Sequence, residues 1–340
     1  DEVTAIDRLA KLTKEDIVTF VNKYLTDQNY AVIYKKQGQN PNEKKMAKPT
    51  ITPIVMNRDV ASDFLKEIQN SNVKPIEPVF LDFKKDLSQL KAKSGIPVLY
   101  KQNTSNDLFQ LIYVFDMGNN NDKALGTAFD YIDYLGTSDM TPEQVKSEFY
   151  RLACNFRVSP GNERTYVVLS GLNENMPEAM KLFEKLMADA QVNKEAYTNM
   201  VADILKSRKD AKLNQMQNFR RLMNYGMYGP KSPATNILTE TELQTMDPQE
   251  LTDRIHNQNS YKHRIMYYGP TSEKELLAII NKNHQAPKKL KEIPVGNEFP
   301  RLETPVTKVL ISPYEAKQIY MTQLSNRGEK FDPMIEPSRQ

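Results

Sequence analysis

The fold of this chain is decided by residues 123–172, KALGTAFDYIDYLGTSDMTPEQVKSEFYRLACNFRVSPGNERTYVVLSGL. The spacing of apolar residues predicts a helix over 125–135 that ends at Gly136-Thr137. A second helix is expected to begin at Pro142, because proline suits the first helical position. Thr141 can cap this second helix, with a glutamine three residues later to complete a capping box. The stretch therefore begins as helix, turn and helix.

Two extended segments follow the helices and connect them to a larger sheet. A Pro-Gly-Asn sequence at 160–162 is a turn signal between the two segments. Strands are expected at 96–100, 108–117, 155–159, 164–171 and 261–268. Helices are expected at 177–190, 194–209 and 215–228. Another helix is expected to begin at 247, and a last one to run from 271 to 280. Segregated helices and strands predict an α+β fold, with one antiparallel or mixed sheet faced by helices. The nearly continuous apolar run at 108–117 predicts a strand covered on both faces.

The flanking residues predict incomplete units around this main domain. Thr13 is a suitable cap for a helix, which a strand at 30–34 would follow, and a modest helix is expected at 59–69. Strands at 306–311 and 318–323 would open another unit. The predicted division is a domain tail at 1–36, a linker at 37–78, the main domain at 79–286, a second linker at 287–304 and the start of a truncated domain at 305–340.

Composition limits the classes of function. The chain has 340 residues, 39% of them apolar and 26% charged, with a net charge of +3, which favours neither nucleic acid nor a membrane surface as a partner. A single cysteine, Cys154, excludes an intramolecular disulfide and a multi-cysteine zinc site. The chain contains no run of about 18 apolar residues, so no membrane span is expected. Since residue 1 is Asp, the chain is expected to be a cut piece or a processed product, and its compartment, periplasm or envelope versus cytoplasm, stays open.

The residues that could carry chemistry form no complete motif. The three histidines, His256, His263 and His284, lie in neither H-E-x-x-H nor H-x-x-E-H, and are expected to be ordinary histidines. Cys154 follows an apolar helical face and is expected to pack in the core. Three carboxylates at 130, 133 and 139 would form a solvated helix face, with acid–base catalysis or binding of a hard cation as the alternative. The lysines of 35–48 lack interleaved aromatic residues and are expected to be a solvated linker.

Residues 94–172 resemble the start of a domain of the insulinase/pitrilysin family of zinc peptidases. The resemblance rests on the strand phrase Gly95–Tyr100, the apolar strand Leu111–Gly118, the helix Ala124–Thr137 with its Gly-Thr end, and the pattern of Glu148–Ser159. In catalytic domains of that family, the helix before Gly-Thr carries H-x-x-E-H. Its two histidines bind zinc and its glutamate activates water.

This chain departs from the family at the metal site. Phe129 stands where the first histidine would be, Ile132 where the glutamate would be, and Asp133 where the second histidine would be. Asp203 is the loose equivalent of the third ligand, a glutamate on a later helix. Phenylalanine and isoleucine cannot bind zinc, so we expect a degenerate site and no catalytic or metal-binding residue in this segment.

The resemblance implies a place within a longer protein. Family members consist of two halves joined by a linker, of which only the first is catalytic and the second closes over it like a clamshell. This chain is similar to the middle of such a protein, so the expected partners are the catalytic half, which would hold the zinc, and a peptide substrate. The expected function is to wall the substrate chamber and to contribute to its closure. One alternative is a stand-alone scaffold that kept the fold, and another is a hydrolase that uses Cys154, or Asp130 with Asp133.

Overall fold

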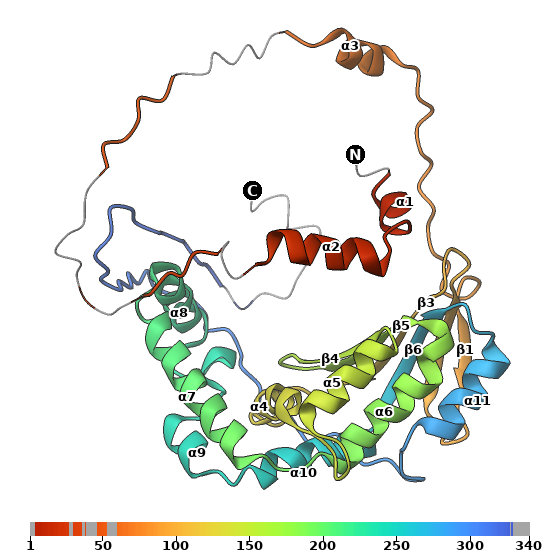
Figure 1. The fold of residues 1–340 in the computed structure, drawn as a ribbon. Helices are drawn as coiled ribbons and strands as arrows, with labels where there is room; N and C mark the ends of the chain where they lie inside the picture. The colour runs from red at the N-terminus through yellow and green to blue at the C-terminus, as the bar shows by residue number, and fades with distance from the viewer. Residues whose placement is uncertain are drawn as a thin grey trace. The chain divides into compact units, whose positions relative to one another are not determined.

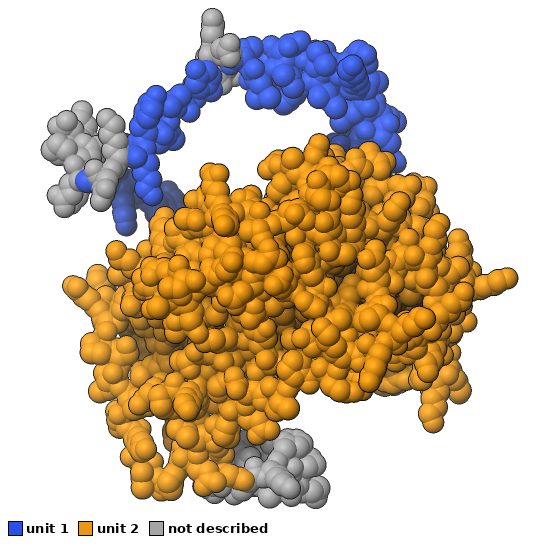
Figure 2. All heavy atoms as spheres, turned by 90° about the horizontal axis from the view of Figure 1, so that it is seen from below, with its two compact units in different colours: residues 1–77 blue, residues 78–340 orange. Residues whose placement is uncertain are grey.

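The computed structural model describes residues 4–26, 30–35, 38, 46–52, 60–326 and 328. Backbone contacts divide the chain into two compact units, Asp1–Glu77 and Pro78–Gln340, which have different colours in Figure 2. No helix in the described part of the chain is both long enough and apolar enough to cross a membrane.

The described residues of the first unit form three helices, α1 (Ala5–Leu9), α2 (Lys14–Tyr24) and α3 (Asp63–Asn70). As predicted, Thr13 caps α2: its hydroxyl accepts a hydrogen bond from the Asp16 backbone N–H, and the Asp16 side chain accepts from the Thr13 N–H. The strand predicted at 30–34 is wrong, because residues 30–35 are exposed and have no regular structure. A lone extended segment has no partner for its backbone hydrogen bonds and does not form a strand.

The second unit is built on a six-stranded mixed sheet. Its strands are β1 (Ser88–Lys91), β2 (Pro97–Gln102), β3 (Leu108–Phe115), β4 (Cys154–Pro160), β5 (Thr165–Leu172) and β6 (His263–Gly269). Their order in the sheet is β1-β2-β6-β3-β5-β4. Among the described strands, β2 and β6 pair in parallel, and the other pairs are antiparallel. The predicted α+β class with a mixed sheet is confirmed.

Helices of the second unit pack on one face of this sheet and extend beyond it. They are α4 (Leu125–Tyr131), α5 (Pro142–Arg151), α6 (Met176–Asp189), α7 (Lys194–Ala211), α8 (Gln215–Tyr228), α9 (Glu240–Thr245), α10 (Gln249–Asn257) and α11 (Glu273–Asn283). Short 3₁₀ helices lie at η1 (Ile132–Tyr134), η2 (Asn173–Asn175), η3 (Pro233–Thr235) and η4 (Gln258–Ser260). In Figure 1, α4, α5, α6 and α11 lie over the sheet, and α7, α8 and α9 extend beyond it.

Along most of the central strand β3, buried residues alternate with more exposed ones. Phe109, Leu111 and Tyr113 are buried beneath the helices, whereas Gln110 is exposed and Ile112 is only half-buried on the opposite face. The expectation that this strand is covered on both faces is therefore wrong for its first half. Antiparallel sheets tolerate one solvated face, which a continuous apolar run does not reveal.

The turn between α4 and α5 is held by close backbone contact. A Cβ at Gly136 would overlap the Met140 carbonyl oxygen and would lie 3.0 Å from the Thr141 carbonyl carbon, so only glycine fits there. Thr141 then caps α5 with the predicted box: its hydroxyl accepts from the Gln144 N–H, and the Gln144 side chain accepts from the Thr141 N–H. These contacts set the direction in which α5 and then β4 leave the turn.

The C-terminal strands predicted at 306–311 and 318–323 are not present. Residues 299–325 are largely exposed and contain no strand. Their alternating apolar residues form a strand only when a neighbouring strand pairs with them, and the described part of the chain provides none.

Candidate functional site

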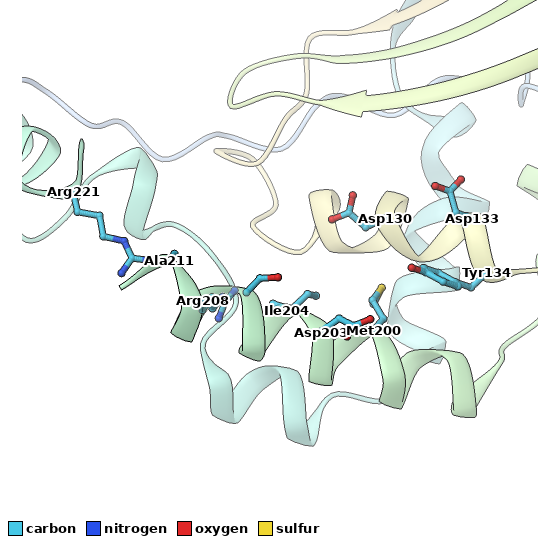
Figure 3. A pocket seen from close by; sticks show the side chains of 10 residues that line it. Asp130, Asp133, Tyr134, Met200, Asp203, Ile204, Arg208, Ala211 and Arg221 are labelled. Atoms are coloured by element: carbon cyan, nitrogen blue, oxygen red, sulfur yellow. The ribbon is translucent and has the colours of Figure 1, made fainter. Parts of the chain in front are cut away.

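A pocket of about 530 Å³ lies between the end of α4 and the helices α7 and α8. Its size falls within the range of small-ligand sites. The lining residues are Asp130, Asp133, Tyr134, Met200, Asp203, Ile204, Ser207, Arg208, Ala211 and Arg221. Figure 3 shows Asp130, Asp133 and Tyr134 on one wall, and Met200, Asp203, Ile204 and Arg208 along α7 on the other.

Tyr131 fixes the two walls relative to each other. Its hydroxyl donates to the Asn193 carbonyl at 2.6 Å and accepts from the Asn193 backbone N–H at 2.8 Å. The Asn193 side chain also caps α7 by accepting from the Ala196 N–H at 3.0 Å. The ring of Tyr131 packs edge-on against Tyr197 on α7, with ring centroids 5.8 Å apart. The N-terminus of α7 is therefore attached to the helix that carries Asp130.

The carboxyl groups of the first wall have perturbed acidities. The surrounding protein raises the pKa of Asp130 above its usual value, and the nearby Asp133 charge raises it further. Asp133 is exposed, but partial desolvation by the surrounding protein also raises its pKa, and Lys146 on α5 offsets part of this effect. On the opposite wall, Arg208 donates to the Leu238 carbonyl at 2.8 Å. Perturbed carboxyl groups beside cationic side chains are frequent at functional sites, and this set suits polar or charged side chains of a ligand.

The four positions that the resemblance predicts as a degenerate metal site separate into two groups. Phe129 and Ile132 are 3% and 1% exposed and belong to the hydrophobic core. Asp133 and Asp203 instead line the same pocket, so the structure brings together the two polar members of the predicted set.

The residues present do not fit zinc. Zinc sites use several nitrogen, sulfur or carboxylate ligands converging on one point. The side chains of Phe129 and Ile132 have no donor atom, and both are packed in the core. Within the described residues, no group of three or more His, Cys, Asp or Glu side chains is placed to hold a metal ion.

Two other candidates lie away from this pocket. Asp139, which the sequence grouped with Asp130 and Asp133, accepts from the Thr137 hydroxyl at 2.7 Å and pairs with Lys185. Cys154 is 5% exposed at the start of β4, and burial raises the pKa of its thiol. A nucleophilic cysteine needs a lowered pKa, so its environment fits packing.

The expectation of ordinary histidines did not include a buried cluster that two of them form. His284 Nδ1 lies 2.6 Å from Glu184 Oε1, and His284 Nε2 lies 2.8 Å from His263 Nε2. Glu184 and His284 are 100 residues apart in sequence, so no local motif predicts their contact. A signal was present on α6, where Glu184 follows Met180 by four residues and so falls on the apolar face of the helix.

Comparison with known proteins places this geometry among peptidase folds. No protein-family model matches the chain, and a search of the curated proteins finds no match. Among solved structures, the periplasmic protease PqqL of Escherichia coli matches with a TM-score of 0.56 and 14% identity, over 89% of this chain and 31% of PqqL. A peptidase M16 inactive domain of Pseudomonas fluorescens matches with a TM-score of 0.52 and 16% identity, over 63% of this chain and 54% of that one.

A third structure supports the same conclusion. A putative M16-like peptidase of Alicyclobacillus acidocaldarius matches with a TM-score of 0.50 and 13% identity, over 65% of this chain and 55% of that one. At these identities the likeness is one of fold: the chain has a fold like that of M16 peptidases, including their inactive domains. The chain spans about a third of PqqL and about half of the other two structures.

Proposed function

We propose that this chain is a non-catalytic segment of an insulinase/pitrilysin-like zinc metallopeptidase, and that it forms part of the peptide chamber and contributes to its closure. The main support is the combination of an M16-like fold with a metal position whose first and central residues, Phe129 and Ile132, are buried in the core. A fold that lost its ligands but kept a pocket at the same place is suited to hold a peptide without cleaving it.

The sheet edge beside the pocket is the proposed contact for the peptide. The sheet has two edge strands, β1 with four residues and β4 with seven, and α4 of the pocket packs against β4. At the two ends of the β4–β5 pairing, Leu172 N donates to Ala153 O and Gly161 N donates to Arg164 O. The backbone groups of residues 153 and 161 therefore face β5, and so do those of every second residue between them. Alternation then directs the backbone groups of Phe156 and Val158 away from β5, where an extended peptide could add as another strand.

Exposed apolar surface supports the proposal of a partner half. In the first unit, Phe20 on α2 and Phe64 on α3 are 58% and 72% exposed. In the second unit, Ile311 and Ile319 are 78% and 91% exposed, in segments whose sequence favours strands. Apolar side chains exposed on a protein surface mark interaction sites where they gather into a patch. We propose that the catalytic half of the parent protein, which would carry the zinc, covers part of it.

A substitution at the free edge tests peptide binding. Val158→Pro removes an outward N–H and leaves the pairing with β5 intact, as Pro160 already does at the next outward position. With fluorescein-labelled casein as an unfolded polypeptide probe, we expect the anisotropy titration to give a Kd at least about tenfold higher for the variant, since the lost contact is worth about 1.4 kcal/mol.

Val158→Ala is the matched control, because it shortens the same side chain and keeps the N–H. It should bind casein like the unmodified chain, and both variants should keep far-UV circular dichroism. Equal binding by the proline and alanine variants would rule out β4 as the peptide edge. Absence of casein binding by the unmodified chain would contradict the proposed function itself.

A further inference from the structure

A buried chain of polar groups crosses the second unit and connects four elements. Glu184 on α6 is 1% exposed, and the side chain of His284, directly after α11, is 2% exposed. His263 begins β6 and is 7% exposed. Tyr113 on β3 donates to Glu184 Oε1 at 3.0 Å. None of these residues lines the pocket described above.

The hydrogen-bond partners determine where the protons lie on His263. Its Nδ1 is 2.7 Å from the Tyr261 carbonyl oxygen, which can only accept, so Nδ1 carries a proton. The neutral ring then has a free lone pair on Nε2, which accepts from Nε2–H of His284 at 2.8 Å. His263 is thus neutral in this arrangement, with its tautomer fixed by the backbone.

The other end of the chain carries a charge pair. Glu184 accepts from Tyr113 Oη and His284 Nδ1 at Oε1, and from Asn259 Nδ2 and the Gln285 backbone N–H at Oε2. Four donors around one carboxyl group suit its ionised form. His284 then donates from both ring nitrogens, to Glu184 and to His263, and is positively charged.

The surroundings of His263 oppose a second charge. Its titratable neighbours are His284, Glu184 behind it and Tyr113 on β3, and the aromatic ring of Phe115 packs against it at 4.7 Å between centroids. Next to it on β6, Arg264 pairs with Asp116, which also pairs with Arg164. Burial lowers the pKa of His263 from 6.5 to about 4, the charge of His284 lowers it as well, and the bond to the Tyr261 carbonyl opposes these effects.

Protonation of His263 breaks the contact with His284. With a proton on Nε2, both facing nitrogens would be donors, at a separation that is now a 2.8 Å hydrogen bond. Two positively charged rings would also face each other in a site with little water. When the histidine pair gains a net proton and both rings are doubly protonated, the repulsion is relieved by His284 moving away from His263.

The segment that moves with His284 is a strap, defined here as residues 284–297. Its first anchor is this cluster, through His284 and the Gln285 N–H to Glu184 at 3.1 Å. Later anchors are the Lys291 N–H to the Ser260 carbonyl at 2.8 Å and the Asn297 N–H to the Asn120 carbonyl at 2.7 Å. Both later anchors are backbone hydrogen bonds, so protonation of His263 does not change them directly.

We propose that His263 is an acid sensor, which holds the start of the strap on the core when neutral and releases it on taking up a proton. The sign follows from linkage: His263 stabilises the fold above its ordinary pKa of 6.5, and this contribution is lost as the pH falls toward about 4. When the pH falls from about 7.5 to about 5, proton uptake by His263 alone lowers the folding equilibrium constant about 30-fold.

Thermal unfolding as a function of pH tests the proposal on the full chain. His263→Gln keeps an acceptor near the Nε2 position and cannot be protonated. His256→Gln is the matched control, because His256 contacts the Ala190 carbonyl outside the cluster. We expect the Tm of the unmodified chain and of His256→Gln to fall steeply from about pH 7.5 to about pH 5, and that of His263→Gln to fall markedly less. Equal slopes for all three proteins would overturn the proposal.

Hydrogen exchange on the unmodified chain gives an independent test, which holds even if His263→Gln does not fold. After correction for intrinsic exchange rates, the protection of peptides covering 284–290 should fall by up to about 30-fold between about pH 7.5 and about pH 5, while peptides covering β3 and β5 keep theirs. Unchanged protection of 284–290 would contradict release of the strap, and simultaneous loss over the whole unit would show global unfolding instead.

Discussion

At Gly136 the chain folds back so closely that the backbone leaves no room for a side chain. A Cβ there would meet the Met140 carbonyl oxygen and would lie 3.1 Å from the Pro142 nitrogen, and both neighbours are backbone atoms that cannot turn aside. The Gly136 carbonyl also accepts from the Gln191 N–H at 2.9 Å, which connects this turn to the end of α6. The Gly-Thr pair thus has a packing role that does not depend on metal chemistry.

Gly136→Ala is expected to destabilise the fold by about 2–4 kcal/mol, because the turn must shift to admit the methyl group. Urea unfolding monitored by circular dichroism measures this loss. Gly226→Ala is the matched control: it lies inside α8, where a Cβ would meet Leu310 at an ordinary 3.4 Å. Alanine is the better helix former there, so stability should rise slightly. A neutral Gly136→Ala would contradict the packing account.

Single residues show where prediction from sequence reaches its limit. Phe129 and Ile132 could be recognised as unable to bind metal from their chemistry alone, although the burial of both side chains in the core needed the fold. Glu184 was overlooked because its partners, His284 and Tyr113, come from distant elements. A charged residue on the apolar face of α6 was the available clue.

Helix α5 is the element best specified by local sequence. Its cap, its initial proline and its buried residues Val145 and Phe149 could all be read from residues 141–152. The predicted bounds of α8 were confirmed for the same reason, since capping and helical periodicity act within a few residues. In contrast, strands depend on distant partners: the predicted strands at 30–34, 306–311 and 318–323 are wrong, and β1 was not predicted.

Removal of the α5 cap should weaken the element without changing the fold. Thr141→Ala loses the hydroxyl that accepts from the Gln144 N–H and is expected to cost about 1 kcal/mol. Thr141→Ser keeps the hydroxyl and should cost only a few tenths of this amount. Differential scanning calorimetry of the two variants separates loss of the cap from loss of the methyl group. Equal Tm values for both variants would show that the capping bond contributes nothing.

The sheet edge and the strap represent two different uses of the same scaffold. The free edge at β4 depends on strand order, which no local pattern gives, since β6 lies between β2 and β3 although it begins about 150 residues after β3 ends. The strap depends on the contacts that His284, directly after α11, makes with His263 on β6 and Glu184 on α6. Both features therefore become visible only once the topology is known.

At the scale of the whole molecule, the chain has a fold like that of M16 peptidases, and we propose that its metal position is degenerate. The fold class could be predicted because helix and strand signals were segregated along the chain, and the solved M16 structures confirm it. The division at 36, 78, 286 and 304, the catalytic partner half and its zinc stay predictions. Sequence alone could not show that Asp133 and Asp203 share a pocket, because they lie on helices that meet only in the fold.

Zinc analysis tests the central claim of a lost metal site most directly. The unmodified chain and Asp133→Asn would be dialysed in parallel against buffer with micromolar zinc and then against zinc-free buffer, and metal would be measured by inductively coupled plasma mass spectrometry. We predict far less than one zinc per chain in both proteins, and no cleavage of casein by either. One tightly held zinc per unmodified chain, lost in Asp133→Asn, would contradict the account.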